Sequence, residues 1–192
     1  MKSQRISAWA GLLLVLMGSA HAEDEDIEGM SGKLNILGSM HEVPCSLEMA
    51  SMDQTIDLGA VSTSQLQRPG DQATAKAFQL LFKDCQRTAG SIRNERTGNL
   101  TWSAHQPVVT VMFVGLADAD DARLLKVQGI TGMGLRMIDA LGRDVQLGSR
   151  GQPLFLPVGN STQTWNVQPT RTSAPLTSGA FRAVVDFRLK YE

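Results

Sequence analysis

The last twelve residues of the chain alternate between apolar and polar side chains, and this pattern constrains the fold more than any other feature. Apolar residues fall on one face and mostly charged residues on the other, which is the period-two signature of a partly buried strand. The apolar set is Phe181, Ala183, Val185, Phe187, Leu189 and Tyr191. Because nothing follows Glu192 in this sequence, we expect a strand with an unpaired edge that is offered to a partner. An ordinary internal strand of a sheet is the alternative interpretation.

The first 22 residues have the organisation of a secretory signal peptide. Lys2 and Arg5 precede an apolar stretch at residues 8–17, and residues 20–22 form a small-x-small cleavage site. The stretch is shorter than the roughly 18 apolar residues that a membrane helix needs, so no retained membrane span is expected. The mature chain would begin at Glu23 with sixteen basic and nineteen acidic residues, a net charge of −3. This charge predicts no basic face for nucleic acid.

Two cysteines, Cys45 and Cys85, most simply form one disulfide bond in an exported chain. Closing a loop of about 40 residues would stabilise the fold by on the order of 4 kcal/mol. Two free thiols, or half of a metal site, are the alternative interpretation. His41 is the nearest histidine and has no companion ligands nearby, so we expect no metal site, and no sequence motif indicates a cofactor.

Short apolar or alternating runs, separated by turn-forming residues, predict strands through most of the chain. A helical turn or two could form at residues 118–125, but no long amphipathic helix is visible. Many short strands in an exported domain with one disulfide predict an immunoglobulin-like sandwich in a single domain. The expected strands lie at residues 33–37, 55–58, 77–82, 108–114, 134–138, 153–158, 164–167 and 181–192.

The start of the mature chain differs in kind from the rest. Residues 23–26 and Glu28 are acidic and poor in core residues, which is typical of a solvated segment; a role in steering assembly is the alternative. A second alternating segment follows, with one face formed by Met30, Gly32, Leu34 and Ile36. A chain whose first and last segments are both strand-like can polymerise by donating the first to the edge beside the last segment of a neighbour.

Taken together, these segments resemble the pilin subunits that a periplasmic chaperone and an outer-membrane usher assemble in Gram-negative bacteria. Each motif is weak alone, but their order and spacing are specific, and they cover essentially the whole mature chain. The resemblance rests on residues 32–45, 53–59, 82–85, 134–139 and 187–191.

The resemblance implies an incomplete, all-β immunoglobulin-like sandwich that lacks its seventh strand and is completed by a donor strand. The chain would consist, in order, of a signal peptide (1–22), a donor-strand extension (23–39) and a pilin domain (40–192). The chaperone would pair with the apolar last strand and anchor the carboxylate of Glu192, and at the usher a neighbouring pilin subunit would replace it. The donor side chains would be Met30, Gly32, Leu34 and Ile36, with Gly32 at a shallow pocket that leaves no room for a side chain. The implied function is a structural subunit of a surface fimbria that supports cell adhesion.

Other interpretations remain at this point. Three segments resemble minor subunits, including one that terminates polymerisation: the ending Tyr191-Glu192, residues 46–49 and the polar segment 86–99. We expect a polymerising subunit, and a terminator is the alternative. An exported enzyme is the alternative of another class, but no nucleophile and base are spaced for catalysis, and residues 129–134 lack the spacing of a phosphate loop. A tip adhesin would need a receptor-binding domain for which this chain has no room.

Overall fold

A computed structural model of the chain describes residues 33–39 and 43–191. The chain divides into two compact units, Met1–Met40 and His41–Glu192. In the first unit, residues 33–39 form no helix or strand, and Leu34, Ile36 and Leu37 are 83, 84 and 95% exposed. The prediction of a strand at residues 33–37 is therefore wrong for the single chain, because no described backbone pairs with this segment.

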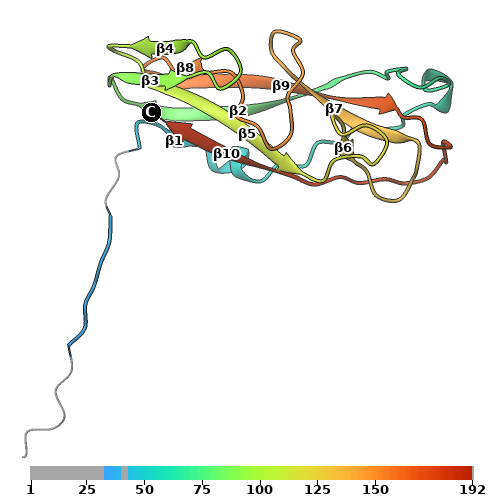
Figure 1. The fold of residues 1–192 in the computed structure, drawn as a ribbon, viewed down its shortest axis with the longest axis horizontal. Coiled ribbons are helices and arrows are strands. Elements are labelled where there is room, and N and C mark those ends of the chain that lie inside the picture. Colours follow the sequence, from blue (N-terminus) through green and yellow to red (C-terminus); the bar gives the residue numbers. More distant parts are fainter. Residues whose placement is uncertain (1–32, 40–42, 192) are drawn as a thin grey trace, which may run out of the picture. The chain divides into compact units, whose positions relative to one another are not determined.

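The second unit consists mainly of antiparallel strands in packed layers (Figure 1). Among the described residues its helical elements are single turns, α1 (Met49–Met52) and the 3-10 turn η1 (Thr63–Gln65). This architecture confirms the predicted all-β sandwich. The strands are β1 (Ser46–Leu47), β2 (Lys76–Cys85), β3 (Gly90–Arg93), β4 (Leu100–Ser103), β5 (Val108–Gly115), β6 (Leu125–Lys126), β7 (Met133–Asp139), β8 (Leu154–Phe155), β9 (Gly159–Arg171) and β10 (Val185–Tyr191).

One layer is a five-stranded antiparallel sheet in the order β1-β2-β9-β7-β6. The long strand β9 lies in its middle, with Trp165 opposite Phe78 of β2 and Val167 opposite Met137 of β7. Apolar residues alternate along these strands, so one face of the sheet is apolar and turns inward. Met137 and Trp165 are only 2 and 4% exposed, which shows that this face is closed by the rest of the sandwich.

The facing layer is a three-stranded sheet in the order β10-β5-β8. Its middle strand β5 sends Val109, Val111 and Phe113 into the core, where they are at most 2% exposed. The ring of Phe113 lies edge-on to Phe78 and Trp165 of the opposite sheet, with centroid distances of 6.0 and 5.6 Å. Both sheets therefore bury their apolar faces in one common core.

The strands β3 and β4 form a separate hairpin beside β5 (Figure 1). β3 and the turn lie within the polar segment 86–99, and β4 follows directly after it. Sequence analysis missed both strands, because they are short and only Ile92 supplies a large buried side chain. Polar residues form the turn between them: the side-chain oxygen of Asn94 accepts hydrogen bonds from the backbone of Arg96 and Thr97.

The last strand is shorter than predicted, since β10 begins at Val185 rather than at residue 181. Upstream, Arg182 exchanges two backbone hydrogen bonds with Gln128, of 2.8 and 3.0 Å, and so pairs with a segment outside β5. Gly129 makes this approach possible: its φ is +103°, and a Cβ there would lie 2.3 Å from the carbonyl oxygen of Ala180. The chain thus joins the three-stranded sheet only after this crossing.

Three other expected elements differ from the structure. Residues 55–58 pair with no strand, and at 153–158 only Leu154–Phe155 does. Residues 118–125 form a polar turn that leads into β6 instead of a helix, with Asp118 and Asp121 accepting backbone hydrogen bonds. Within the residues that the structure describes, no helix is long and apolar enough to cross a membrane.

Candidate strand-pairing edge

The apolar face of the last strand lies against the core without being closed over. From residue 181 to residue 191, odd-numbered positions are partly buried and even-numbered positions are exposed. Phe187 contacts the core ring of Phe113, with centroids 6.4 Å apart. The partly buried set has the predicted members Phe181, Ala183, Val185, Phe187, Leu189 and Tyr191. The structure therefore gathers these side chains on one face, along a row where the core still meets solvent.

β10 is also the edge of its sheet. It pairs with β5 over its whole length, from Val185 opposite Gly115 to Tyr191 opposite Val109. On its other side no strand lies among residues 33–39 and 43–191. In an antiparallel ladder half of the backbone N–H and C=O groups of an edge strand point away from its single partner. These groups are a template on which one more strand can pair.

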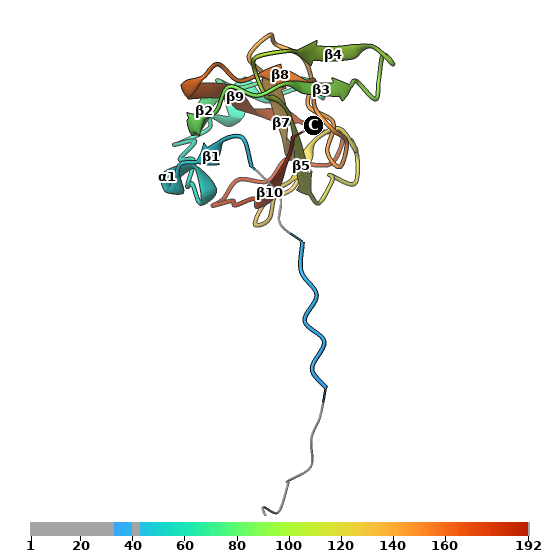
Figure 2. The same ribbon diagram turned by 90° about the vertical axis from the view of Figure 1, so that its left-hand side faces the viewer.

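The carboxyl end of β10 lies beside the segment that leads into β1, as both views show (Figure 2). The hydroxyl of Tyr191 donates to the carbonyl oxygen of Cys45 over 3.5 Å. Cys45 and Cys85 form a disulfide bond, which ties this segment to the end of β2. Burial raises the pKa of Tyr191 to about 12, so its hydroxyl is neutral at physiological pH.

A second row of partly buried apolar side chains comes from the segment after α1. Ile56, Leu58 and Val61 pack against the same core as β10, although their backbone joins no ladder. The side-chain amide of Gln54 donates to the carbonyl oxygen of Gln79 over 2.8 Å and so holds the segment beside β2. Sequence analysis predicted a strand here and did not connect it with the site. The alternation of Ile56 and Leu58 with polar neighbours was the available signal.

The residues predicted to be donated are only partly described. Leu34 and Ile36 are exposed, whereas Met30, Gly32 and Glu192 lie outside the described residues, as does the signal peptide at 1–22. Two positions apart, Leu34 and Ile36 share a face whenever this segment is extended. The chain thus carries exposed apolar side chains with the spacing that a partly open apolar row on a strand can accept.

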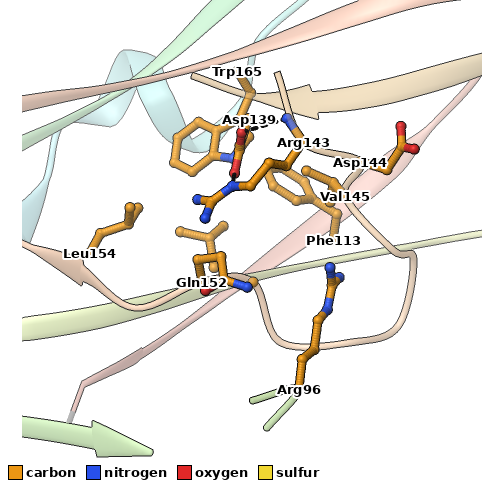
Figure 3. A pocket seen from close by; sticks show the side chains of 11 residues that line it. Arg96, Phe113, Asp139, Arg143, Asp144, Val145, Gln152, Leu154 and Trp165 are labelled. Carbon is orange, nitrogen blue, oxygen red and sulfur yellow. Dashed lines mark hydrogen bonds and ion pairs between the residues drawn. The ribbon is translucent and has the colours of Figure 1, made fainter. Parts of the chain in front are cut away.

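A small hollow lies elsewhere, where the end of β7 pairs with the middle of β9 (Figure 3). Trp165, Val145 and Leu154 line it together with charged side chains. Figure 3 shows Arg143 turned onto Asp139, and its Nε donates to the carboxylate over 2.7 Å. This ion pair neutralises the two charges within the wall, so they present no free charge to a ligand. Among the described residues, no group of His, Cys, Asp and Glu is placed to hold a metal ion.

Comparison with known proteins gives a consistent result. The family model described as "Fimbrial protein" matches residues 33–192. The Long polar fimbria protein A of Salmonella typhimurium is 26% identical over 191 residues, which cover 97% of this chain and 96% of that protein.

Solved structures of pilus subunits are also similar. The P pilus rod subunit PapA is 27% identical with a TM-score of 0.63, over 78% of this chain and all of that one. A structure of a chaperone-usher pilus, which concerns the uncoiling of its rod, is 26% identical with a TM-score of 0.63, over 86% of this chain and 98% of that one. These similarities confirm the immunoglobulin-like pilin fold that the sequence predicts.

Proposed function

Since this chain belongs to the fimbrial protein family, we propose that strand donation joins it to the neighbouring pilins that are its partners. The chain is a structural subunit of a chaperone-usher pilus, and its location is the fimbria. In this proposal the segment 23–39 of one subunit pairs with β10 of the next. The family is one of structural proteins, and we propose that the subunit performs no catalysis.

The observation that carries the proposal is the incomplete cover over β10. Its inward row, including Phe187, is only partly buried, while its outer backbone edge has no partner among the described residues. One added strand would satisfy both deficits, since it supplies backbone hydrogen bonds to the edge and side chains to the row. The partly buried residues Ile56 and Leu58 would receive cover from the same strand.

The donor side chains are Met30, Gly32, Leu34 and Ile36. Burying an exposed leucine or isoleucine contributes about 1.5–3 kcal/mol before ordering costs are subtracted. Several such residues on one face, together with the backbone ladder, would make a durable joint. The exposure of Leu34 and Ile36 in the single chain supports this role, because apolar side chains with no intramolecular cover gain most from a partner.

Before assembly, the same edge needs protection. We propose that the signal peptide at 1–22 directs export and is removed, and that a periplasmic chaperone lends a strand to β10 and binds the carboxylate of Glu192. At the outer-membrane usher the extension of the next subunit would then displace the chaperone. An exposed strand edge is an aggregation site, which gives the physical reason for such a transient partner.

A chain-extending role is favoured over a terminating one. Long polar fimbria protein A matches nearly the whole chain, and the P pilus rod subunit matches its fold at a TM-score of 0.63. A terminator would carry the same sandwich but would accept no further donor. The two roles therefore differ in one measurable property, exchange at β10.

The test uses the chaperone-bound subunit and a synthetic peptide of residues 23–40, with chaperone release followed by native mass spectrometry. We expect the peptide to displace the chaperone. Peptides with Leu34→Asp or Ile36→Asp should exchange far more slowly, since a charge would enter the apolar row. The Leu37→Asp peptide is the matched control, because Leu37 lies on the opposite face of an extended segment.

Equal exchange by all of these peptides would overturn the assignment of the donor face. No exchange by any of them, while a known polymerising subunit exchanges in parallel, would overturn the chain-extending role and favour a terminator.

A further inference from the structure

The central strand β5 is apolar on both of its faces. Its odd-numbered residues lie in the core, and its even-numbered residues form an outward row. A strand of an antiparallel sandwich normally turns polar residues outward, whereas a continuous apolar run is typical of a strand that is covered on both faces. The outward row consists of Val108, Thr110, Met112 and Val114, and Leu116 continues it beyond the strand.

The β3–β4 hairpin covers the first part of this row. At Val109 both edges of β5 are occupied, by β10 and by β8, and the five-stranded sheet faces its inner side. The hairpin contacts β5 and therefore lies over the outer face. Val108 and Thr110 are accordingly only 0 and 2% exposed. Ile92, 1% exposed, is on the hairpin face that turns inward.

The other end of the row is open. Leu116 and Val184 are 68 and 75% exposed. The register that pairs Val185 with Gly115 places them opposite each other, on the outward face. The outer patch, as we name it, consists of the partly buried Met112 and Val114 and the exposed Leu116 and Val184.

The hairpin itself carries a second exposed apolar surface. Side chains alternate along a strand, so Leu100 and Trp102 of β4 point away from the face of Ile92. They are 55 and 65% exposed. Tryptophan is among the residues enriched where proteins bind one another. We name Leu100 and Trp102 the hairpin face.

The two surfaces belong to opposite ends of β10. The hairpin begins five residues after Cys85 and ends five residues before Val108, and it lies at the end where β10 finishes (Figure 1). The outer patch reaches Val184, directly before the start of β10. A contact between opposite ends of successive copies is heterologous, and such contacts build an open chain rather than a closed dimer.

Strand donation brings these two ends to the same junction. Every strand pair of the described chain is antiparallel. A donor that continues this pattern has its carboxyl end beside Val185 of the accepting subunit. The six steps from position 39 to Cys45 of the donating subunit span at most about 20 Å. Cys45 accepts the hydrogen bond of Tyr191 and so lies at the hairpin end. Chain length therefore keeps the hairpin end of one subunit near the outer patch of the next.

We propose that the hairpin face of the donating subunit packs on the outer patch of the subunit that accepts its strand. The occupant is a second copy of this chain, and the proposal rests on strand donation. Surfaces of two and four side chains do not reach the roughly 800 Å² per partner of a stable free complex. They suffice once the donated strand holds the copies together, because the linkage raises their effective concentration. The contact fixes the angle between consecutive subunits.

Fimbriae assembled from a subunit with both Trp102→Cys and Leu116→Cys test this contact. A donated strand is not covalent, so denatured natural fimbriae separate into single subunits. After oxidation in air with a copper catalyst, the double variant should give a ladder of linked subunits in gel electrophoresis. Fimbriae with W102C alone or L116C alone should give none. W102C with L141C is the matched control, since Leu141 is 76% exposed in a turn outside both surfaces.

Three outcomes would overturn the contact. One is the absence of a ladder from W102C with L116C in fimbriae that assemble. Another is an equal ladder from W102C with L141C. The third is linked dimers from W102C alone, because the hairpin faces would then meet each other. Mass spectrometry of the Cys45–Cys85 disulfide checks that each variant is correctly folded.

Bending stiffness provides a second measurement without new thiols. W102D should make fimbriae bend more in electron micrographs, since a charge would enter an apolar contact at every junction. L141D should leave the stiffness unchanged. Unchanged stiffness of W102D fimbriae, with loss of their binding to host cells, would assign the hairpin face to a receptor and overturn the proposal.

The two proposals fail in different ways. The peptide of residues 23–40 carries no hairpin, so its exchange measures strand donation alone and should be equal for the natural subunit and L116D. If the peptide exchanges and no ladder forms, only the side contact is overturned. If the peptide does not exchange, strand donation is overturned and the contact with it.

Discussion

The two sheets of the sandwich use the same alternation of apolar and polar residues and reach different degrees of burial. In the five-stranded sheet, Phe82 and Trp165 are 1 and 4% exposed. In the three-stranded sheet, β5 is equally closed, but the inward residues of β10 are only partly buried. The difference arises from position rather than composition, because β10 has a neighbour on one side only.

If strand donation joins the subunits as proposed, the surface that binds a neighbour has the same residue pattern as a core. Phe187 and Leu189 have the residue types and the spacing of buried core positions, and they do pack on the core. The element that would finish their burial is missing from the described domain. A sandwich strand that is apolar but only partly covered therefore indicates a partner that supplies the rest of the layer.

The largest expected effect on stability comes from replacing one phenylalanine in each sheet with alanine. Phe82→Ala should lower the free energy of unfolding by about 3–5 kcal/mol, since it empties a closed core position. Phe187→Ala should cost only about 1–2 kcal/mol in the bare subunit, because less of its surface leaves water on folding. Urea unfolding measures both values.

The same two variants in the donor-bound subunit sharpen the result. The cost of Phe187→Ala should rise towards that of Phe82→Ala when a donor covers the row. Equal costs in the bare subunit would mean that β10 is already closed.

A smaller effect is expected where the chain crosses into the three-stranded sheet. Gly129→Ala should cost about 2 kcal/mol or more, since the new Cβ would lie 2.3 Å from the Ala180 oxygen at a φ of +103°. Gly142→Ala is the control: it has a φ of +76° with no atom within 4 Å of the added Cβ, and it should cost about 1 kcal/mol. Hydrogen exchange should quicken in β10 but not in β9 of the Gly129 variant. Uniform quickening would show that the two sheets unfold as one.

The smallest effect concerns pH. Burial raises the pKa of Tyr191 to about 12, against about 10 in an unfolded chain. The folded state therefore holds the proton more tightly, so this contribution to stability is complete below about pH 10 and is lost as the pH rises towards 12. Tyr191→Phe should remove that part of the alkaline loss, measured by urea unfolding at a series of pH values.

Tyr191 is the single tyrosine of the chain, so tyrosinate absorbance reports its titration directly. A donor that covers the row should shift the titration to still higher pH. An unchanged titration on donor binding would place Tyr191 outside the joint.

Sequence alone predicted the parts of the fold whose apolar periodicity is strong. The runs at 77–82, 108–114 and 134–138 became β2, β5 and β7, because each alternates or is continuously apolar and meets a closed core. The hairpin of β3 and β4 was missed, since Ile92 is its one large buried side chain. The thirteen residues of β9 were predicted only at 164–167, because polar positions such as Gln163 and Gln168 interrupt the apolar signal.

The candidate site was predicted by residue type but not by extent. The odd-numbered set from Phe181 to Tyr191 has the expected face because alternation fixes side-chain direction wherever the backbone is extended. The start of β10 at Val185 depends on the pairing of Arg182 with Gln128, which is a tertiary contact that no local pattern encodes. The second row at Ile56 and Leu58 likewise depends on where the chain passes the core.

The continuous register of β10 on β5 also has a mechanical consequence. Seven consecutive residues pair, from Val185 with Gly115 to Tyr191 with Val109, and no bulge interrupts them. The hydrogen bonds of an antiparallel ladder lie perpendicular to the strands. A pull along the axis of β10 therefore loads all of these bonds in shear at once, whereas a pull across the strand would open them one after another. Tension along the strand axis is the direction in which this edge resists rupture best.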